Sequence, residues 1–143
     1  MKKINIGING FGRIGRVFTR INEISDNFNL VFINDINSNI KNLAYLLKYD
    51  STYGVFNGSI EPNENDSSIL INGKKVKCFS SRSILDLPWE ELEIDYLVDS
   101  SGVSQGVIDA KKLTTEKKFS KYIFTHCSDD ADTEVVMGGN DSE

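Results

Sequence analysis

The hydrophobic positions near the N-terminus change their spacing at residue 10. Residues 4–9 form a short run rich in isoleucine, which indicates a strand. Apolar side chains then recur at helical spacing, at Ile14, Val17, Phe18 and Ile21. The pattern therefore predicts a strand, a glycine turn at residues 10–15 and a helix from about Arg13 to Ser25, which residues 25–27 close.

A second strand and a second helix follow. Residues 30–33 are continuously apolar, as expected of a parallel strand buried on both faces. Four apolar residues then share one helical face within residues 39–48, and Ser38 is the expected N-cap. The first strand, first helix and second strand predict a right-handed βαβ unit.

The pattern then becomes antiparallel. Asn72-Gly73 separates two strand-like runs, residues 68–71 and 75–79, and this dipeptide favours a hairpin with a type I′ turn. A plain doubly wound fold would continue with another βα unit at this point. Residues 61–67 are polar and are expected to form a mobile loop.

The second half returns to alternating strands and helices. The expected elements are a helical turn at 88–92, a strand at 95–99, a helix at 106–113, and strands at 121–124 and 134–138. The fold class is therefore α/β, a Rossmann-type doubly wound, mostly parallel sheet with an antiparallel hairpin excursion. Residues 1–143 form one domain, which matches the usual domain length.

Composition and charge exclude several classes of function. The net charge is −5 and the lysines are scattered, so we expect no nucleic-acid partner. No apolar run approaches the roughly 20 residues of a membrane span, so we expect no membrane partner and a cytoplasmic location. Two cysteines and one histidine predict neither a disulfide framework nor a metal site, and Asp129, Asp130 and Asp132 fit a solvated turn.

Gly10, Gly12 and Gly15 form a G-x-G-x-x-G pattern between the first strand and the first helix. Gly10 permits the tight turn, Gly12 lets the backbone approach a pyrophosphate, and Gly15 allows close packing of helix and strand. The free N–H groups and positive dipole of the helix N-terminus favour a diphosphate. An ordinary glycine-rich βα turn is the alternative, and the flanking elements favour the nucleotide site.

Asp35 lies at the end of the second strand, twenty residues after Gly15. A carboxylate there can accept hydrogen bonds from the adenosine ribose and repels a 2′-phosphate, which favours NAD over NADP. The alternative is a cap or loop acid in a polar turn. The small residues 100–102 end another strand, so they should face the glycine turn across the cofactor crevice.

Five motifs in this order resemble the phosphorylating glyceraldehyde-3-phosphate dehydrogenases. They are residues 8–16, 33–35, 47–54 with 56–58, 98–103 and 136–140. The resemblance covers essentially the whole chain. It implies the NAD-binding Rossmann domain of a homo-oligomeric glycolytic enzyme, in which a second domain supplies the catalytic cysteine.

The resemblance also implies the cofactor-binding residues. Those expected along the pyrophosphate are Asn9, Gly10, Phe11, Gly12, Arg13 and Ile14. Asp35 would hold the adenosine ribose and Arg82 would lie at the adenine edge. Ser101 and Gly102 would lie near the adenine and ribose, and Thr125 near the nicotinamide ribose and ring. Ser104 departs from the family, which usually has an aromatic residue there, and this change should loosen the adenine wall.

The family's Ser-Cys-Thr-Thr-Asn-Cys segment, with its nucleophilic cysteine, follows shortly after the last of these motifs. We therefore expect the catalytic domain to be absent from this chain, no catalytic residue among the 143, and no activity of the chain alone. His126 and Cys127 make a poor dyad, because adjacent residues of an extended segment point to opposite faces. Cys78 is expected to pack inside the hairpin, and His126 to lie in a loop beside a half-buried Cys127.

Two other functions remain open from the sequence. One is a stand-alone, non-catalytic NAD-binding or regulatory module. The other is the cofactor domain of a related phospho-aldehyde dehydrogenase, such as one that acts on erythrose 4-phosphate. The residues that would select the aldehyde belong to the family's second domain.

Overall fold

The computed structural model describes residues 3–141. Its strands are β1 (Ile4–Asn9), β2 (Phe28–Asn34), β3 (Tyr49–Asp50), β4 (Gly54–Val55), β5 (Ile60–Asn63), β6 (Ser68–Ile71), β7 (Lys74–Phe79), β8 (Tyr96–Asp99) and β9 (Lys121–Phe124). Its helices are α1 (Arg13–Ser25), α2 (Ile40–Lys48) and α3 (Gln105–Thr115), with the 3-10 turns η1 (Ile84–Asp86) and η2 (Trp89–Glu91).

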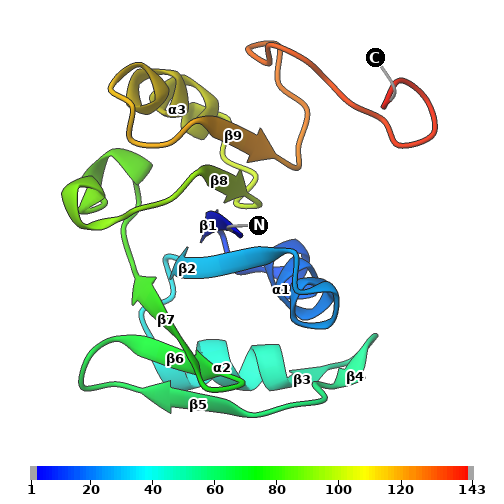
Figure 1. Cartoon of the computed structure of the whole chain (residues 1–143), viewed down its shortest axis with the longest axis vertical. Coiled ribbons are helices and arrows are strands. Elements are labelled where there is room, and N and C mark those ends of the chain that lie inside the picture. The colour runs from blue at the N-terminus through cyan, green and yellow to red at the C-terminus, as the bar shows by residue number, and fades with distance from the viewer. Residues whose placement is uncertain (1–2, 142–143) are drawn as a thin grey trace.

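Seven strands form one twisted sheet in the order β5-β6-β7-β2-β1-β8-β9 (Figure 1). The strands β7, β2, β1, β8 and β9 are parallel, whereas β5, β6 and β7 pair antiparallel. The two short strands β3 and β4 form a separate antiparallel pair. This topology confirms the predicted doubly wound sheet with its antiparallel excursion.

Each face of the sheet has its own hydrophobic core. On one face, isoleucines of β1, β2 and β6 pack against Leu43 and Leu47 of α2. On the other face, Phe32 and Leu97 pack against Trp89 of η2 and Leu113 of α3. Helices on both faces leave the carboxyl ends of the parallel strands as the open edge where ligands bind in such sheets. In residues 3–141, no helix has the length and apolar composition needed to cross a bilayer.

The predicted hairpin is confirmed in its register and its turn. Ile71 of β6 faces Lys74 of β7, which leaves Asn72 and Gly73 as the two turn residues. Both residues have positive φ, 50° and 78°, as a type I′ turn requires.

Two local expectations before this hairpin were wrong. Residues 61–63 of the expected mobile loop belong to β5, with Pro62 opposite Ile69. Proline is compatible with this position because β5 is the edge of the sheet and needs no further N–H donor. Asn39, and not Ser38, caps α2: its side chain accepts a hydrogen bond from the Asn42 N–H at 2.9 Å.

The prediction of a strand at residues 134–138 was also wrong. Within residues 3–141, β9 is the outermost strand on that side and nothing pairs with residues 134–138. Val135, Val136 and Met137 are exposed, and the chain turns back through N–H bonds from Gly139 and Asn140 to the Val136 carbonyl. A β-branched run without a partner strand leaves its backbone groups unpaired. The local pattern of β-branched residues was therefore not sufficient to form a strand here.

Gly7 and Phe32 lie opposite each other on the two central strands. They are register partners, and a Cβ built on Gly7 would lie 2.2 Å from the Phe32 ring. The glycine therefore leaves the space that the buried aromatic ring occupies.

We expect Gly7→Ala to lower the free energy of unfolding by about 1–3 kcal/mol, because a buried ring must shift. Denaturant titration of Gly7→Ala, Phe32→Leu and the double variant measures this coupling. The double variant should cost clearly less than the sum of the single ones. Additive costs would show that the ring and the glycine do not compete for space.

Candidate nucleotide-binding site

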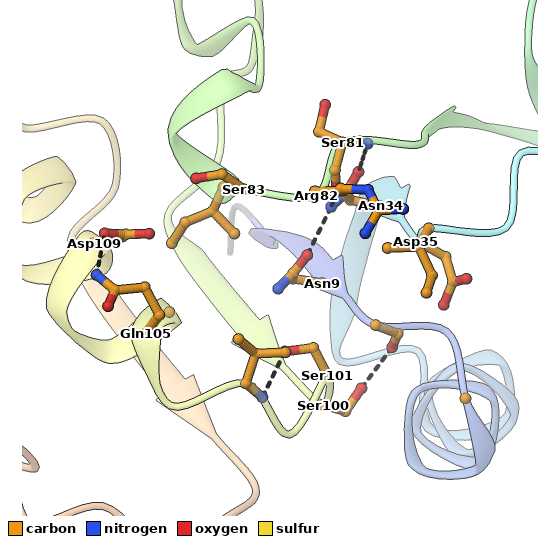
Figure 2. A pocket seen from close by; sticks show the side chains of 16 residues that line it. Asn9, Asn34, Asp35, Ser81, Arg82, Ser83, Ser100, Ser101, Gln105 and Asp109 are labelled. Atoms are coloured by element: carbon orange, nitrogen blue, oxygen red, sulfur yellow. Dashed lines mark hydrogen bonds between the residues drawn. The ribbon is translucent and has the colours of Figure 1, made fainter.

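A cavity of about 340 Å³ lies at the carboxyl ends of the central strands (Figure 2). Its walls come from the turn after β1, the end of β2, the segment after β7 and the junction between β8 and α3. The lining residues are Asn9, Gly10, Gly12, Asn34, Asp35, Ile36, Ser81, Arg82, Ser83, Ile84, Ser100, Ser101, Val103, Gln105, Gly106 and Asp109. Its volume falls in the range of small-molecule sites.

Each glycine of the first turn has a distinct steric role. Gly10 has φ +87°, and a Cβ on it would lie 2.5 Å from the Ser101 nitrogen. A Cβ on Gly15 would lie 2.4 Å from the Gly10 carbonyl oxygen, so α1 packs directly on the turn. Apart from Gly12 and its neighbours along the chain, no atom of residues 3–141 lies within 4 Å of a Cβ built on Gly12. The middle glycine thus faces open space, which fits the close approach of a diphosphate.

The start of α1 offers free hydrogen-bond donors beside this open space. Gly12 is the N-cap and gives no side-chain cap, and the first helical bond runs from the Arg16 N–H to the Gly12 carbonyl. Among residues 3–141, no acceptor is found for the N–H groups of Arg13 and Ile14. These donors and the positive end of the helix dipole suit an anion.

Asp35 supports the turn as well as facing the cavity. One carboxylate oxygen accepts the Phe11 N–H at 2.7 Å, and the other accepts the Asn37 N–H at 2.8 Å. A carboxylate oxygen can accept more than one hydrogen bond, so lone pairs remain for the hydroxyls of a ribose. Asp35 also orders the turn at Asn37, so the alternative interpretation of Asp35 as a loop acid describes part of its role.

The junction after β8 closes against the glycine turn, as expected from the fold. The Ser100 hydroxyl donates to the Gly10 carbonyl at 2.6 Å, and the Ser100 N–H donates to the Asn9 carbonyl at 2.8 Å. Gly102 follows with φ +74°, which turns the chain toward α3. The two junctions are thus bonded to each other beneath the cavity.

The structure brings part of the predicted residues together. Those that line the cavity are Asn9, Gly10, Gly12, Asp35, Arg82 and Ser101; those that do not are Phe11, Arg13, Ile14, Gly102 and Thr125. The Phe11 side chain is buried in the core, so only its backbone faces the turn. Thr125 is exposed after β9, where its N–H donates to the Asp99 carbonyl at 3.1 Å. Ser104 is exposed and Val103 forms the wall beside it.

Sequence reasoning missed a buried line of polar side chains under the cavity. Asn9 and Asn34 are bonded to each other, the Asp99 carboxylate extends the line on one side, and the backbone of half-buried Ser81 ends it on the other. The sequence carries a signal for it, because each of Asn9, Asn34 and Asp99 is a polar residue that ends an apolar strand.

A cavity formed by parallel strand ends, a glycine turn and an acid at the end of the second strand defines a dinucleotide-binding α/β domain. The family described as the NAD-binding domain of glyceraldehyde 3-phosphate dehydrogenase matches residues 4–107. The chain belongs to this family, and NAD is the cofactor of its domain.

Curated relatives agree with the family along most of the chain. The glyceraldehyde-3-phosphate dehydrogenase of Colletotrichum lindemuthianum is 43% identical over 99% of this chain and 41% of its own length. The chloroplastic enzyme GAPCP1 of Arabidopsis thaliana is 50% identical over 71% of this chain and 24% of its own. Glyceraldehyde-3-phosphate dehydrogenase 1 of Bacillus cereus is 40% identical over 94% of this chain and 39% of its own. The chain thus spans about two fifths or less of the length of these relatives.

Neither cysteine lies in the cavity. Cys78 is buried in β7, as expected, and burial raises the pKa of its thiol to about 12. Cys127 is exposed, and not half-buried as expected, while the adjacent His126 is half-buried beside the Phe124 ring. No group of three or more potential metal ligands is found in residues 3–141.

We expect Asp35→Ala to destabilise the free protein by about 1–3 kcal/mol, because the Phe11 N–H loses a charged acceptor. Thermal or denaturant unfolding without nucleotide measures this cost. Asp86→Ala, at an exposed position of η1, is the control and should change stability by less than about 0.5 kcal/mol. Equal effects of the two substitutions would contradict the structural role of Asp35.

We expect a thiol-alkylating reagent at neutral pH to modify Cys127 and to spare Cys78 until the protein unfolds. The Cys78 thiol stays protonated and shielded, whereas Cys127 is accessible. Peptide mass spectrometry after labelling distinguishes the two sites. Rapid labelling of Cys78 in the folded chain would contradict its burial.

Proposed function

We propose that this chain holds NAD for the phosphorylating oxidation of glyceraldehyde 3-phosphate in glycolysis. The observation that carries the proposal is the start of α1. There, open space at Gly12 adjoins free N–H donors, and Asp35 accepts the N–H of Phe11, the residue before Gly12. A diphosphate and an adenosine ribose are joined in one molecule, so both features fit the same ligand.

The proposed contacts follow the order of groups along the dinucleotide. The diphosphate lies along the turn, against Asn9, Gly10, Phe11, Gly12, Arg13 and Ile14, mostly through their backbone. Asp35 accepts the ribose hydroxyls, Arg82 lies along the adenine edge, and Ser101 with Gly102 forms the opposite wall. Thr125, which does not line the cavity, is the proposed neighbour of the nicotinamide ribose and ring.

Asp35 also provides the preference between the two nicotinamide cofactors. Its carboxylate faces the cavity and is held there by two backbone N–H groups. A 2′-phosphate would place negative charge beside this carboxylate and would displace a hydroxyl donor. The same carboxylate therefore favours NAD and disfavours NADP.

Bound NAD would supply the hydride acceptor for oxidation of the aldehyde. The residues of this chain bind and orient the cofactor, which is the usual contribution of protein in cofactor chemistry. We place the attacking thiol outside these 143 residues, in the part of the relatives' length that this chain does not match. Buried, protonated Cys78 and exposed Cys127 support this placement, because neither faces the cavity.

We further propose a cytoplasmic protein that forms a homo-oligomer. Two free cysteines fit a reducing compartment. Ile14, Ile21 and Ile24 are exposed along one side of α1, and apolar side chains in a row are typical of a covered surface.

We expect Gly12→Val to weaken NAD binding by at least about tenfold, because its side chain fills the space that the diphosphate needs. Asp35→Ala should weaken NAD binding and bring the affinities for NAD and NADP closer together. Isothermal titration calorimetry with both cofactors measures the two effects.

The control for this experiment is Glu61→Val, which places the same side chain at an exposed position of the edge strand β5, away from the cavity. It should leave the NAD affinity unchanged. Unchanged NAD binding by Gly12→Val would refute the proposed diphosphate site. Unchanged discrimination by Asp35→Ala would refute the ribose assignment.

A further inference from the structure

Asp99 ends β8 and is fully buried beneath the cavity. Among the residues that the structure describes, no lysine or arginine forms an ion pair with it. We propose that Asp99 is a positioning residue of the NAD site, whose carboxylate sets the direction of a hydrogen-bond chain joining both walls of the cavity. This inference rests on the proposed function, because the walls in question are those that would hold NAD.

Three residues give Asp99 four hydrogen bonds. One carboxylate oxygen accepts the Asn9 side-chain amide at 2.8 Å and the Tyr122 hydroxyl at 2.7 Å. The other accepts the Ser101 N–H at 2.8 Å and the Ser101 hydroxyl at 2.6 Å. Every partner is a donor, and an ionised carboxylate is a pure acceptor. One group on each oxygen, the Asn9 NH₂ on one and the Ser101 N–H on the other, can only donate, so both oxygens must act as acceptors.

The donor-to-acceptor direction of the hydrogen-bond chain follows from the Asp99 carboxylate at one end of it. Since the Asn9 NH₂ group is turned toward Asp99, its oxygen faces Asn34 and accepts the Asn34 NH₂ group at 2.7 Å. The Asn34 oxygen then accepts the Ser81 N–H at 2.9 Å, while its NH₂ group also donates to the Ser81 carbonyl at 3.0 Å. An amide has a donor side and an acceptor side of nearly equal shape, so its partners decide its orientation.

Burial makes this orientation consequential. Asn9 is 9% exposed and Asn34 is 2% exposed, so water cannot readily replace a lost partner. Burial first, and then the charge of Asp99, raises the pKa of Tyr122, which keeps its hydroxyl protonated and donating. The start of α3 lies against the same carboxylate, because a Cβ on Gly106 would come within 3.0 Å of it.

The hydrogen-bond chain connects the two sides of the proposed NAD site. Ser101 forms one wall, and Ser81 precedes Arg82 in the other wall; Figure 2 shows Asn9 and Asn34 between these segments. An asparagine at position 99 would present an NH₂ group to a cluster of donors. Turning Asn9 over would relieve that conflict. It would also force Asn34 to turn and to present NH₂ to the Ser81 N–H, which moves the conflict to the opposite wall.

The test compares Asp99→Asn and Asp99→Glu with the unmodified chain. Two measurements are made on each: backbone amide NMR signals without nucleotide, and NAD affinity by calorimetry. We expect Asp99→Asn to shift the Ser81 amide signal, although Ser81 does not contact residue 99, and to weaken NAD binding roughly tenfold. Asp99→Glu keeps a pure acceptor and should restore the Ser81 signal and most of the affinity.

Asn22→Ala is the matched control for a purely structural effect. Asn22 is also a buried amide, and it bonds the Phe28 N–H and carbonyl far from the cavity. Its loss should lower stability while leaving the Ser81 signal and the NAD affinity unchanged. If Asp99→Asn does not fold, Asn9→Ala cuts the chain at its middle. That variant should shift the Ser81 amide and leave the Ser101 amide, which remains bonded to Asp99.

An unmoved Ser81 signal in a folded Asp99→Asn chain would overturn the proposal, and so would unchanged NAD affinity despite a moved signal. In the fallback variant, an unmoved Ser81 signal would overturn it as well. Failure of the unmodified chain to bind NAD would instead refute the function proposed for the site. The Ser81 signal would still decide whether Asp99 directs the hydrogen-bond chain.

Discussion

The contact between the glycine turn and the end of β8 fixes the positions of the other parts of the site. Gly10 has no side chain, so the Ser100–Ser101 backbone can lie against it, and the Ser100 hydroxyl bonds the Gly10 carbonyl. Any side chain at residue 10 would separate the two junctions. This contact sets where α1 begins and which way its free N–H groups point, and it places Ser101 opposite them.

Buried polar groups at the strand ends fix the positions of the side chains and backbone at this edge of the sheet. Apolar packing on both faces holds the strands together but tolerates small shifts. Hydrogen bonds have a direction, and a buried one that is broken is costly. Asp35 fixes the turn through the Phe11 N–H, and Asp99 fixes the side chains beneath the cavity. One carboxylate thus belongs to a residue that lines the cavity, while the other supports the cavity from below.

The sequence predicts the parts of this protein that depend on local patterns. The G-x-G-x-x-G turn, α1, and the Asn72-Gly73 hairpin follow from spacing and from residues that tolerate positive φ. The missed parts depend on partners distant in sequence. The expected strand at 134–138 has no pairing strand, and β5 forms because β6 lies beside it. The link from Asp99 to Asn9 spans 90 positions, so the local pattern marks each as a polar residue at a strand end but cannot pair them.

The central claim is that the start of α1 and Asp35 hold one dinucleotide between them. A crystal structure of this chain with NAD tests it most directly. The account predicts the diphosphate against the N–H groups of Arg13 and Ile14, and the adenosine ribose hydroxyls within hydrogen-bond distance of Asp35. A cofactor whose diphosphate lies away from the glycine turn, or whose ribose does not contact Asp35, would contradict it.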